Sequence, residues 1–218
     1  MKQAFGLSVP EQLNEFCSPE RTALIVYDMQ AGIVPQLPDG SRIASGCQQL
    51  LAAAREGGFR IFFTRHLFLP NRIAGIGQLR RAMVWQGKGD PGETTPLFTA
   101  DSPSFQIVPE LTPQANEAVI DKITMSAFEG TYLDIAMRDA QLQAFIIAGI
   151  ALEVGIEPTV RQGLDLNYLP IVVSDLCGSK AGEARERSLE NLKATGEVVE
   201  TTFSDLLPLL RRYSVSAS

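Results

Sequence analysis

Two charged residues stand where buried strands are expected to end, and together they could do acid–base chemistry. Asp28 follows the apolar run at residues 22–27, and Lys122 follows another at residues 118–121. A lysine at the end of a buried run is costly unless its charge is paired, so pairing with Asp28 is the economical explanation. A carboxylate beside a cation can hold or deliver a proton at a substrate atom. These residues alone leave open whether the pair serves folding or catalysis.

Other reactive side chains are few. The only histidine, His66, comes just after the apolar run at 60–64 and is either a pocket residue or an ordinary strand-end residue. The three cysteines, Cys17, Cys47 and Cys177, are far apart and predict neither a disulfide framework nor a structural zinc site. Cys177 alone lies near an expected strand end, where a small buried apolar residue is a better interpretation than a nucleophile.

The elements that must position these residues follow from an alternation along the chain. Near-continuous apolar runs suit the strands of a parallel sheet that is covered on both faces. They occupy residues 22–27, 60–64, 118–121, 144–148 and 170–174. Helix-compatible spacing lies at residues 41–57, 131–140, 153–166 and 183–195. We predict one domain over residues 1–218 with a doubly wound α/β fold, a Rossmann-like three-layer sandwich.

Right-handed crossovers in such a fold bring the carboxyl ends of all strands to one edge, where ligands bind. The polar or small residues expected at these ends are Asp28, Thr64, Lys122, Gly149 and Asp175. The segment from residue 66 to about 105 is different, because it is rich in glycine and proline around a helical patch at 78–85. Connections of this length inside a domain are usually functional or disordered. We expect a cap over the pocket or a contact between subunits.

Composition limits the partners. The 19 basic and 25 acidic residues give a formal charge of −6, with no long basic run. This balance argues against nucleic acid and against an anionic membrane as partners. The sequence contains neither a signal-like apolar segment at its start nor a membrane-spanning stretch, so we expect a soluble, cytoplasmic protein.

The segment at 149–159, Gly-Ile-Ala-Leu-Glu-Val-Gly-Ile-Glu-Pro-Thr, resembles a family signature. That signature is Gly-x-x-Thr-Asp-x-Cys-Val-x-x-Thr, of the isochorismatase-like (cysteine hydrolase) family. Residues 126–133, Ser-Ala-Phe-Glu-Gly-Thr-Tyr-Leu, are similar to the family's Ser-x-Phe-x-x-Thr-x-Leu motif, and the resemblance runs from about residue 22 to 206. It implies that Asp28 and Lys122 are catalytic and that Gly155 stands at the nucleophile's position.

A glycine at this position changes the chemistry that the resemblance implies. Most members of the family use the cysteine to form a covalent intermediate, which Gly155 cannot do. True isochorismatases also have glycine there and hydrolyse a vinyl ether to release pyruvate. By this resemblance Asp28 is the general acid, and Lys122 holds both the aspartate and the substrate. Leu152 and Glu153 replace the usual Thr-Asp pair, which departs from the family pattern.

The substrate is expected to be small and carboxylated, because basic residues gather in or beside the cap-like segment. These are Arg65, Arg72, Arg80, Arg81 and Lys88. Substrate contacts are assigned to Ala151, Gln78, Trp85, Arg81, His66 and Phe128. The resemblance also implies a cis peptide bond between Ile150 and Ala151. We expect neither a metal nor a cofactor, since the family's metal-binding branch needs more histidines than this chain has.

Several alternatives remain open. The chain could be a binding protein that keeps the fold without catalysis, or an amidase that uses Cys177 or activated water. A glycine engineered in place of cysteine would give the same sequence. A homodimer or larger homo-oligomer is what the family resemblance suggests.

Overall fold

A six-stranded parallel sheet forms the centre of the computed structural model, which describes residues 1–214. Its strands run in the order β5-β4-β3-β6-β7-β8, so the direction of winding reverses between β3 and β6. The predicted doubly wound α/β class is confirmed. The strands are β3 (Thr22–Tyr27), β4 (Arg60–His66), β5 (Ala118–Lys122), β6 (Ala144–Ile150), β7 (Leu169–Gly178) and β8 (Val199–Thr201).

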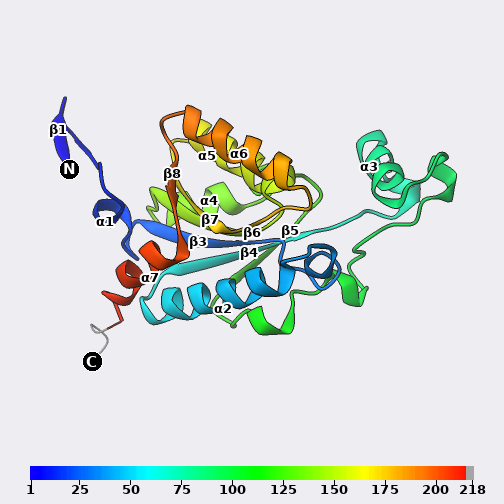
Figure 1. Ribbon diagram of the computed structural model, residues 1–218, viewed down its shortest axis with the longest axis horizontal. Helices are drawn as coiled ribbons and strands as arrows, with labels where there is room; N and C mark the ends of the chain where they lie inside the picture. Colours follow the sequence, from blue (N-terminus) through cyan, green and yellow to red (C-terminus); the bar gives the residue numbers. More distant parts are fainter. Residues whose placement is uncertain (215–218) are drawn as a thin grey trace.

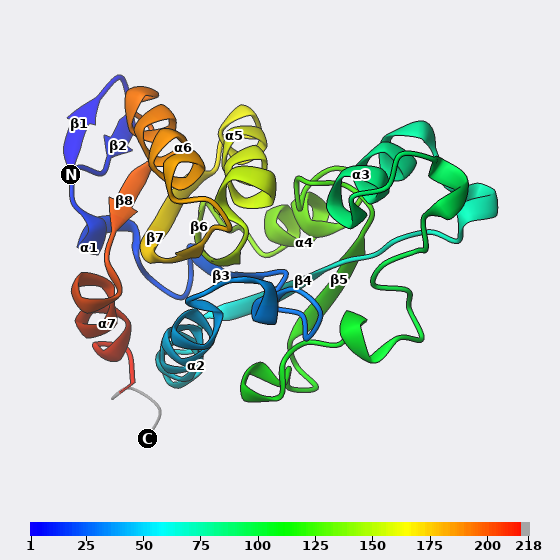
Figure 2. The same cartoon turned by 45° about the vertical axis from the view of Figure 1, so that its right-hand side comes forward.

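Helices cover both faces of the sheet, as Figures 1 and 2 show. On one face, α2 (Gly40–Glu56) and α7 (Phe203–Arg211) enclose a core that includes Leu24 and Val26. On the other face, α4 (Leu133–Asp139), α5 (Glu157–Asp165) and α6 (Gly182–Ala194) cover Ile25 and Tyr27. Because successive strand residues point to opposite faces, an apolar run without alternation is what a doubly covered strand requires.

Several local features differ from the sequence prediction. β7 runs on to Gly178, so Asp175 lies inside the strand rather than at its end, and its carboxylate accepts a hydrogen bond from Phe203 N at 2.8 Å. The predicted helix over 153–166 begins as a π-helical turn, η6 (Leu152–Ile156), before α5 continues. β8 and the antiparallel pair β1 (Lys2–Ala4) and β2 (Leu7–Val9) carry no recognisable pattern in so few residues.

The cap-like segment projects from the body of the molecule and contains α3 (Ile76–Gln86), as Figures 1 and 2 show. It has a small core of its own, which contains Phe68, Ala82, Phe98 and Phe105. The remaining short elements are α1 (Leu13–Phe16), η1 (Val34–Gln36), η2 (Asn71–Ile73), η3 (Pro91–Glu93), η4 (Pro103–Phe105) and η5 (Pro109–Leu111). None of the helices within residues 1–214 is both long and apolar enough to span a bilayer.

Candidate active site

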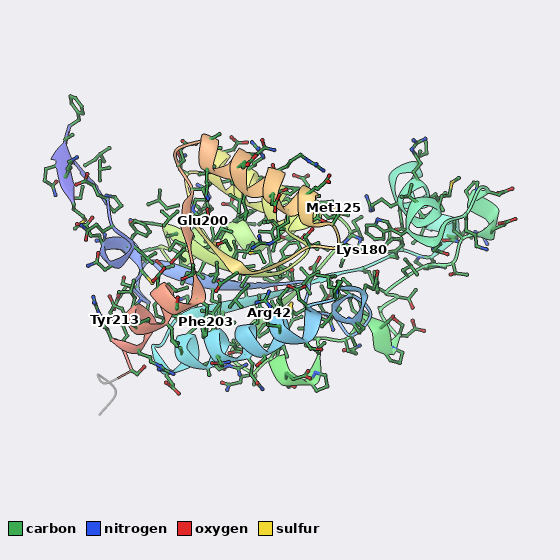
Figure 3. All side chains as sticks on the ribbon, in the orientation of Figure 1. Arg42, Met125, Lys180, Glu200, Phe203 and Tyr213 are labelled. Atoms are coloured by element: carbon green, nitrogen blue, oxygen red, sulfur yellow. The ribbon has the colours of Figure 1, made fainter. Side chains whose placement is uncertain are left out.

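A cavity of about 260 Å³ opens where the winding of the sheet reverses, between the ends of β3 and β6 and beneath the cap. This is the position at which open α/β sheets bind ligands. Figure 3 places Met125 and Lys180, two of its lining residues, on the side of the body that faces α3. The lining comprises Tyr27, Asp28, Ile33, Gln36, Leu37, His66, Trp85, Gln86, Leu97, Phe98, Met125, Ile150, Ala151, Glu153, Val154, Gly155 and Lys180.

Asp28 is the acidic group at the floor of this cavity. It follows β3 directly and has a left-handed backbone, with φ of 47°, an arrangement uncommon for a residue other than glycine. Thr64 donates a hydrogen bond to its Oδ1 at 2.6 Å, and the Asp28 amide donates to the same Thr64 hydroxyl at 3.1 Å. The carboxylate is thus fixed from β4 on one side.

Lys122 fixes the carboxylate from the other side. Its Nζ donates to Asp28 Oδ2 at 2.7 Å, and both side chains are almost completely buried. Burial lowers the pKa of Lys122 and the Asp28 charge opposes that fall. The predicted pairing of these two residues is therefore present in the structure. A second acceptor, the carbonyl of Thr124, lies 3.3 Å from the ammonium.

Gly155 borders the same floor, where the π-helical turn follows β6. Its carbonyl accepts a hydrogen bond from Thr159 Oγ1 at 2.7 Å, and its amide donates to Ala151 O at 3.0 Å. A Cβ at this position would lie only 2.5 Å from Tyr27 Cζ and closer still to its hydroxyl oxygen. The phenol of Tyr27 thus fills the space that a side chain on residue 155 would need. The Ile150-Ala151 peptide bond just before this turn is cis, as the sequence resemblance implies.

His66, at the end of β4, and Trp85, from α3 in the cap, form one wall of the cavity. The His66 ring meets Trp85 with its centroid 6.1 Å away, and Phe68 packs against the same ring at 5.4 Å. Neither ring nitrogen of His66 has a hydrogen-bond partner within residues 1–214. Burial, helped by the positive charges of Lys122 and Arg81, lowers the pKa of His66 to about 3. The imidazole is therefore neutral at ordinary pH.

Two further polar atoms around the site have no partner in the described part of the chain. They are Arg81 Nε and Glu153 Oε2. Buried polar atoms are rarely left unpaired, so such atoms beside a cavity are available to a ligand. Glu153 and Lys180 line the cavity and were not singled out as contacts from the sequence. Glu153 lies in the recognised signature segment, two residues before Gly155, and this position could have predicted that it lines the cavity.

Comparison with known sequences supports this assignment. Residues 22–203 match the isochorismatase domain. The chain belongs to the isochorismatase family. YwoC of Bacillus subtilis (strain 168), an uncharacterized isochorismatase family protein, is 28% identical over 170 residues, which cover 78% of this chain and 84% of that protein. The ureidoacrylate amidohydrolase RutB of Serratia proteamaculans (strain 568) is 26% identical over 200 residues, covering 81% of this chain and 77% of that protein.

The fold has close counterparts among solved structures of the isochorismatase family and its relatives. A cysteine hydrolase from Pseudomonas syringae pv. phaseolicola 1448A superposes with a TM-score of 0.78 at 23% identity, covering 91% of this chain and 96% of that chain. This similarity establishes the fold. The domain match makes the chain an isochorismatase-family hydrolase.

Within this isochorismatase fold, the structure places four of the expected substrate contacts at or near the cavity and two elsewhere. Ala151, Trp85 and His66 line it. Arg81 lies beside it, donates to Ile123 O at 3.4 Å and acts on both His66 and Lys122 through its charge. The amide of Gln78, by contrast, is used by the backbone of Leu69, to which it donates at 2.7 Å and from which it accepts at 2.9 Å.

Phe128 is the second residue that the structure puts elsewhere. Its ring stacks on Tyr168 at 5.5 Å in the core beneath α4 and α5, so it supports the fold rather than the cavity. Its position in a motif gave no information on the direction of its side chain. Cys177 is also buried in that core, where burial raises the pKa of its thiol, and it does not line the cavity.

No group of three or more His, Cys, Asp or Glu side chains within residues 1–214 is arranged to hold a metal ion.

Proposed function

We propose that this protein hydrolyses a small carboxylated vinyl ether of the isochorismate type, without a covalent enzyme intermediate. One observation carries the proposal. Asp28, paired with Lys122, lines a cavity that has no cysteine, serine or threonine among its lining residues in the described part of the chain. A pocket with an acid–base pair and no such nucleophile suits proton transfer followed by attack of water.

The proposed reaction begins with a proton on Asp28. Lys122 supplies it through the hydrogen bond that its Nζ donates to Asp28 Oδ2 at 2.7 Å. Asp28 then protonates the methylene carbon of the enol ether and leaves an oxocarbenium ion next to the restored carboxylate. Water adds to the cationic carbon and gives a proton to the Asp28 carboxylate, which returns it to Lys122. The resulting hemiketal loses its hydroxyl proton and the ether oxygen gains one, with solvent as the carrier, as the C–O bond breaks to give pyruvate and the alcohol.

Charge around the cavity supports a carboxylated substrate. Lys122, Arg81 and Lys180 bring three positive charges, and Asp28 and Glu153 bring two negative charges. The unpartnered Arg81 Nε and the neutral His66 ring can hydrogen-bond to oxygen atoms of a ligand. The apolar walls, such as Ile33, are suited to a small carbon ring.

The decisive experiment is pyruvate release from isochorismate, followed with a coupled lactate dehydrogenase. An Asp28→Asn variant should lose at least 100-fold in kcat, which is the order expected for loss of a general acid. The matched control is Asp139→Asn, an exposed change of the same type at the end of α4. Turnover that is equal in Asp28→Asn and in the wild type would remove Asp28 as the acid. No pyruvate from the wild type would remove this substrate.

Amide hydrolysis by activated water is the second candidate, and the similarity to the ureidoacrylate amidohydrolase RutB favours it. Asp28 would then act as a base toward water instead of as an acid toward carbon. Incubation with ureidoacrylate, followed by chromatography, separates the two reactions. A chain that turns over neither substrate yet binds a small carboxylate would support the non-catalytic alternative.

We also propose a homodimer or larger homo-oligomer. Ile73, Ile76 and Val84, in and just before α3, are exposed apolar residues available for such a contact. Light scattering on the purified chain measures this directly.

A further inference from the structure

Tyr27 and Gly155 form a fitted pair at the floor of the cavity. A Cβ built on Gly155 would lie 2.5 Å from Tyr27 Cζ and 2.6 Å from Cε1, and real Cβ atoms essentially never approach so closely. Both residues line the cavity. Tyr27 and a side chain on residue 155 therefore compete for one volume.

The phenol cannot easily leave that volume. Tyr27 belongs to the central strand β3, is only 1% exposed, and donates a hydrogen bond through its hydroxyl to the carbonyl of Met125. Its main chain is confined as well, because a Cβ on Gly149 would lie 2.9 Å from Tyr27 N and closer to its carbonyl oxygen. Two glycines of the signature segment thus accommodate one tyrosine.

Residue 155 is equally well fixed. Thr159 donates to its carbonyl, and the same Thr159 hydroxyl accepts the amide of Ala127 at 2.9 Å. The turn that carries Gly155 is thereby tied to the loop before α4. A side chain added at this position would have to displace the ring of Tyr27, since the backbone has little freedom to move away.

The Asp28–Lys122 pair also borders this ring. Lys122 Nζ is 4.4 Å from the centre of the Tyr27 ring, and the same ammonium donates to Asp28 Oδ2 at 2.7 Å. Burial, together with the Asp28 charge, raises the pKa of the Tyr27 phenol, so the phenol stays neutral and keeps its place beside residue 155.

We propose that Tyr27 is a specificity-determining residue that sets the class of mechanism in this pocket. Its phenol occupies the space of a side chain on residue 155 and so excludes a covalent route through that position. That the native reaction is non-covalent rests on the proposed function. The exclusion rests on the geometry alone and can be tested without substrate.

The test compares Gly155→Cys with the double variant Tyr27→Val/Gly155→Cys. Each folded protein is treated with iodoacetamide between pH 6 and 9, and modification of residue 155 is followed by peptide mass spectrometry. The native thiols Cys17, Cys47 and Cys177 are buried with raised pKa values, and so give a slow background. A second pair with Tyr27→Leu replaces Tyr27→Val if circular dichroism shows that the valine variant is unfolded.

We expect the double variant to react at pH 7 at least 10-fold faster than Gly155→Cys. Gly155→Cys alone should melt several degrees below the wild type, because its side chain and the phenol overlap.

Two results would overturn the proposal. The first is a Gly155→Cys protein that melts like the wild type and whose thiol reacts as quickly as that of the double variant. The second is a double variant whose thiol on residue 155 stays as slow to react as that of Gly155→Cys. Failure to release pyruvate from isochorismate would count against the proposed function and leave these alkylation results unaffected.

Discussion

Replacement of His66 by phenylalanine should remove an acid-sensitive contribution to stability. The His66 side chain is buried, 3% exposed, and burial together with the charges of Lys122 and Arg81 lowers its pKa from 6.5 to about 3. The folded state therefore binds fewer protons than the unfolded state in this pH window. The stability that neutral His66 retains above pH 6.5 is lost as the pH falls towards 3.

The size of the effect follows from that shift. Proton linkage gives a loss of about 2 kcal/mol between pH 7 and pH 5, and about 3 kcal/mol by pH 4. Phenylalanine preserves the ring contacts with Phe68 and Trp85 and sacrifices no hydrogen bond of the ring, because neither His66 nitrogen has a partner in the described residues. The His66→Phe variant should then match the wild type at pH 7.5.

Urea unfolding, followed by far-ultraviolet circular dichroism at pH 7.5, 6, 5 and 4.5, measures this difference. Carboxylate titrations contribute to both curves and cancel when the two free energies of unfolding are subtracted. The difference should grow in favour of the variant by about 2 kcal/mol at pH 5. Curves that stay parallel within about 0.5 kcal/mol would refute the reasoning, since a histidine that titrates normally in the folded state gives no such divergence.

Three further outcomes are expected. Gly155→Ala should cost about 2 kcal/mol of unfolding free energy in urea, because its Cβ overlaps the Tyr27 ring, and an unchanged midpoint would mean that the ring can move aside. Lys122→Met should cost about 3–5 kcal/mol by leaving the Asp28 charge buried and unpaired, and adding Asp28→Asn should recover much of this, so an additive double variant would argue against their coupling. Cys177 in the native chain should react with iodoacetamide only as fast as the protein unfolds, and rapid modification with loss of activity would restore the thiol-amidase alternative.

Much of the fold could be predicted because the strands of a parallel sheet that is covered on both faces are near-continuous apolar runs in the sequence. The apolar run at 22–27 coincides with β3, and the helix predicted over 41–57 is α2 within one residue at each end. β8 could not be predicted in this way, because its three residues are too few to show a period. β7 extends past its polar residue Asp175. The Asp175 carboxylate accepts a hydrogen bond from the amide of Phe203, the first residue of α7, and no local sequence pattern indicates this contact.

The candidate site was predictable where chemistry and topology agreed. A buried lysine needed a partner, and strand ends of a parallel sheet meet at one edge, so Asp28 and Lys122 came together as expected. Tyr27 was missed because an aromatic residue in a strand is ordinarily a core residue, and its fit to Gly155 exists only in three dimensions. Gln78 was wrongly predicted to contact the substrate. A polar residue near a pocket suggests a ligand contact, but its amide hydrogen-bonds the backbone of Leu69 within the cap.

The cap has a small hydrophobic core that is separate from the two cores packed on the sheet. Two independently packed parts of the chain therefore contribute residues to the cavity. The proposed proton transfer depends on strands that are covered on both faces, whereas Trp85, Leu97 and Phe98 reach the cavity from the cap. Substitutions there can reshape the outer wall while the strands that carry Asp28 and Lys122 stay in register. Variation in substrate preference among related proteins, or selection of a new one in the laboratory, should therefore accumulate between residues 67 and 105 and leave the reaction itself unchanged.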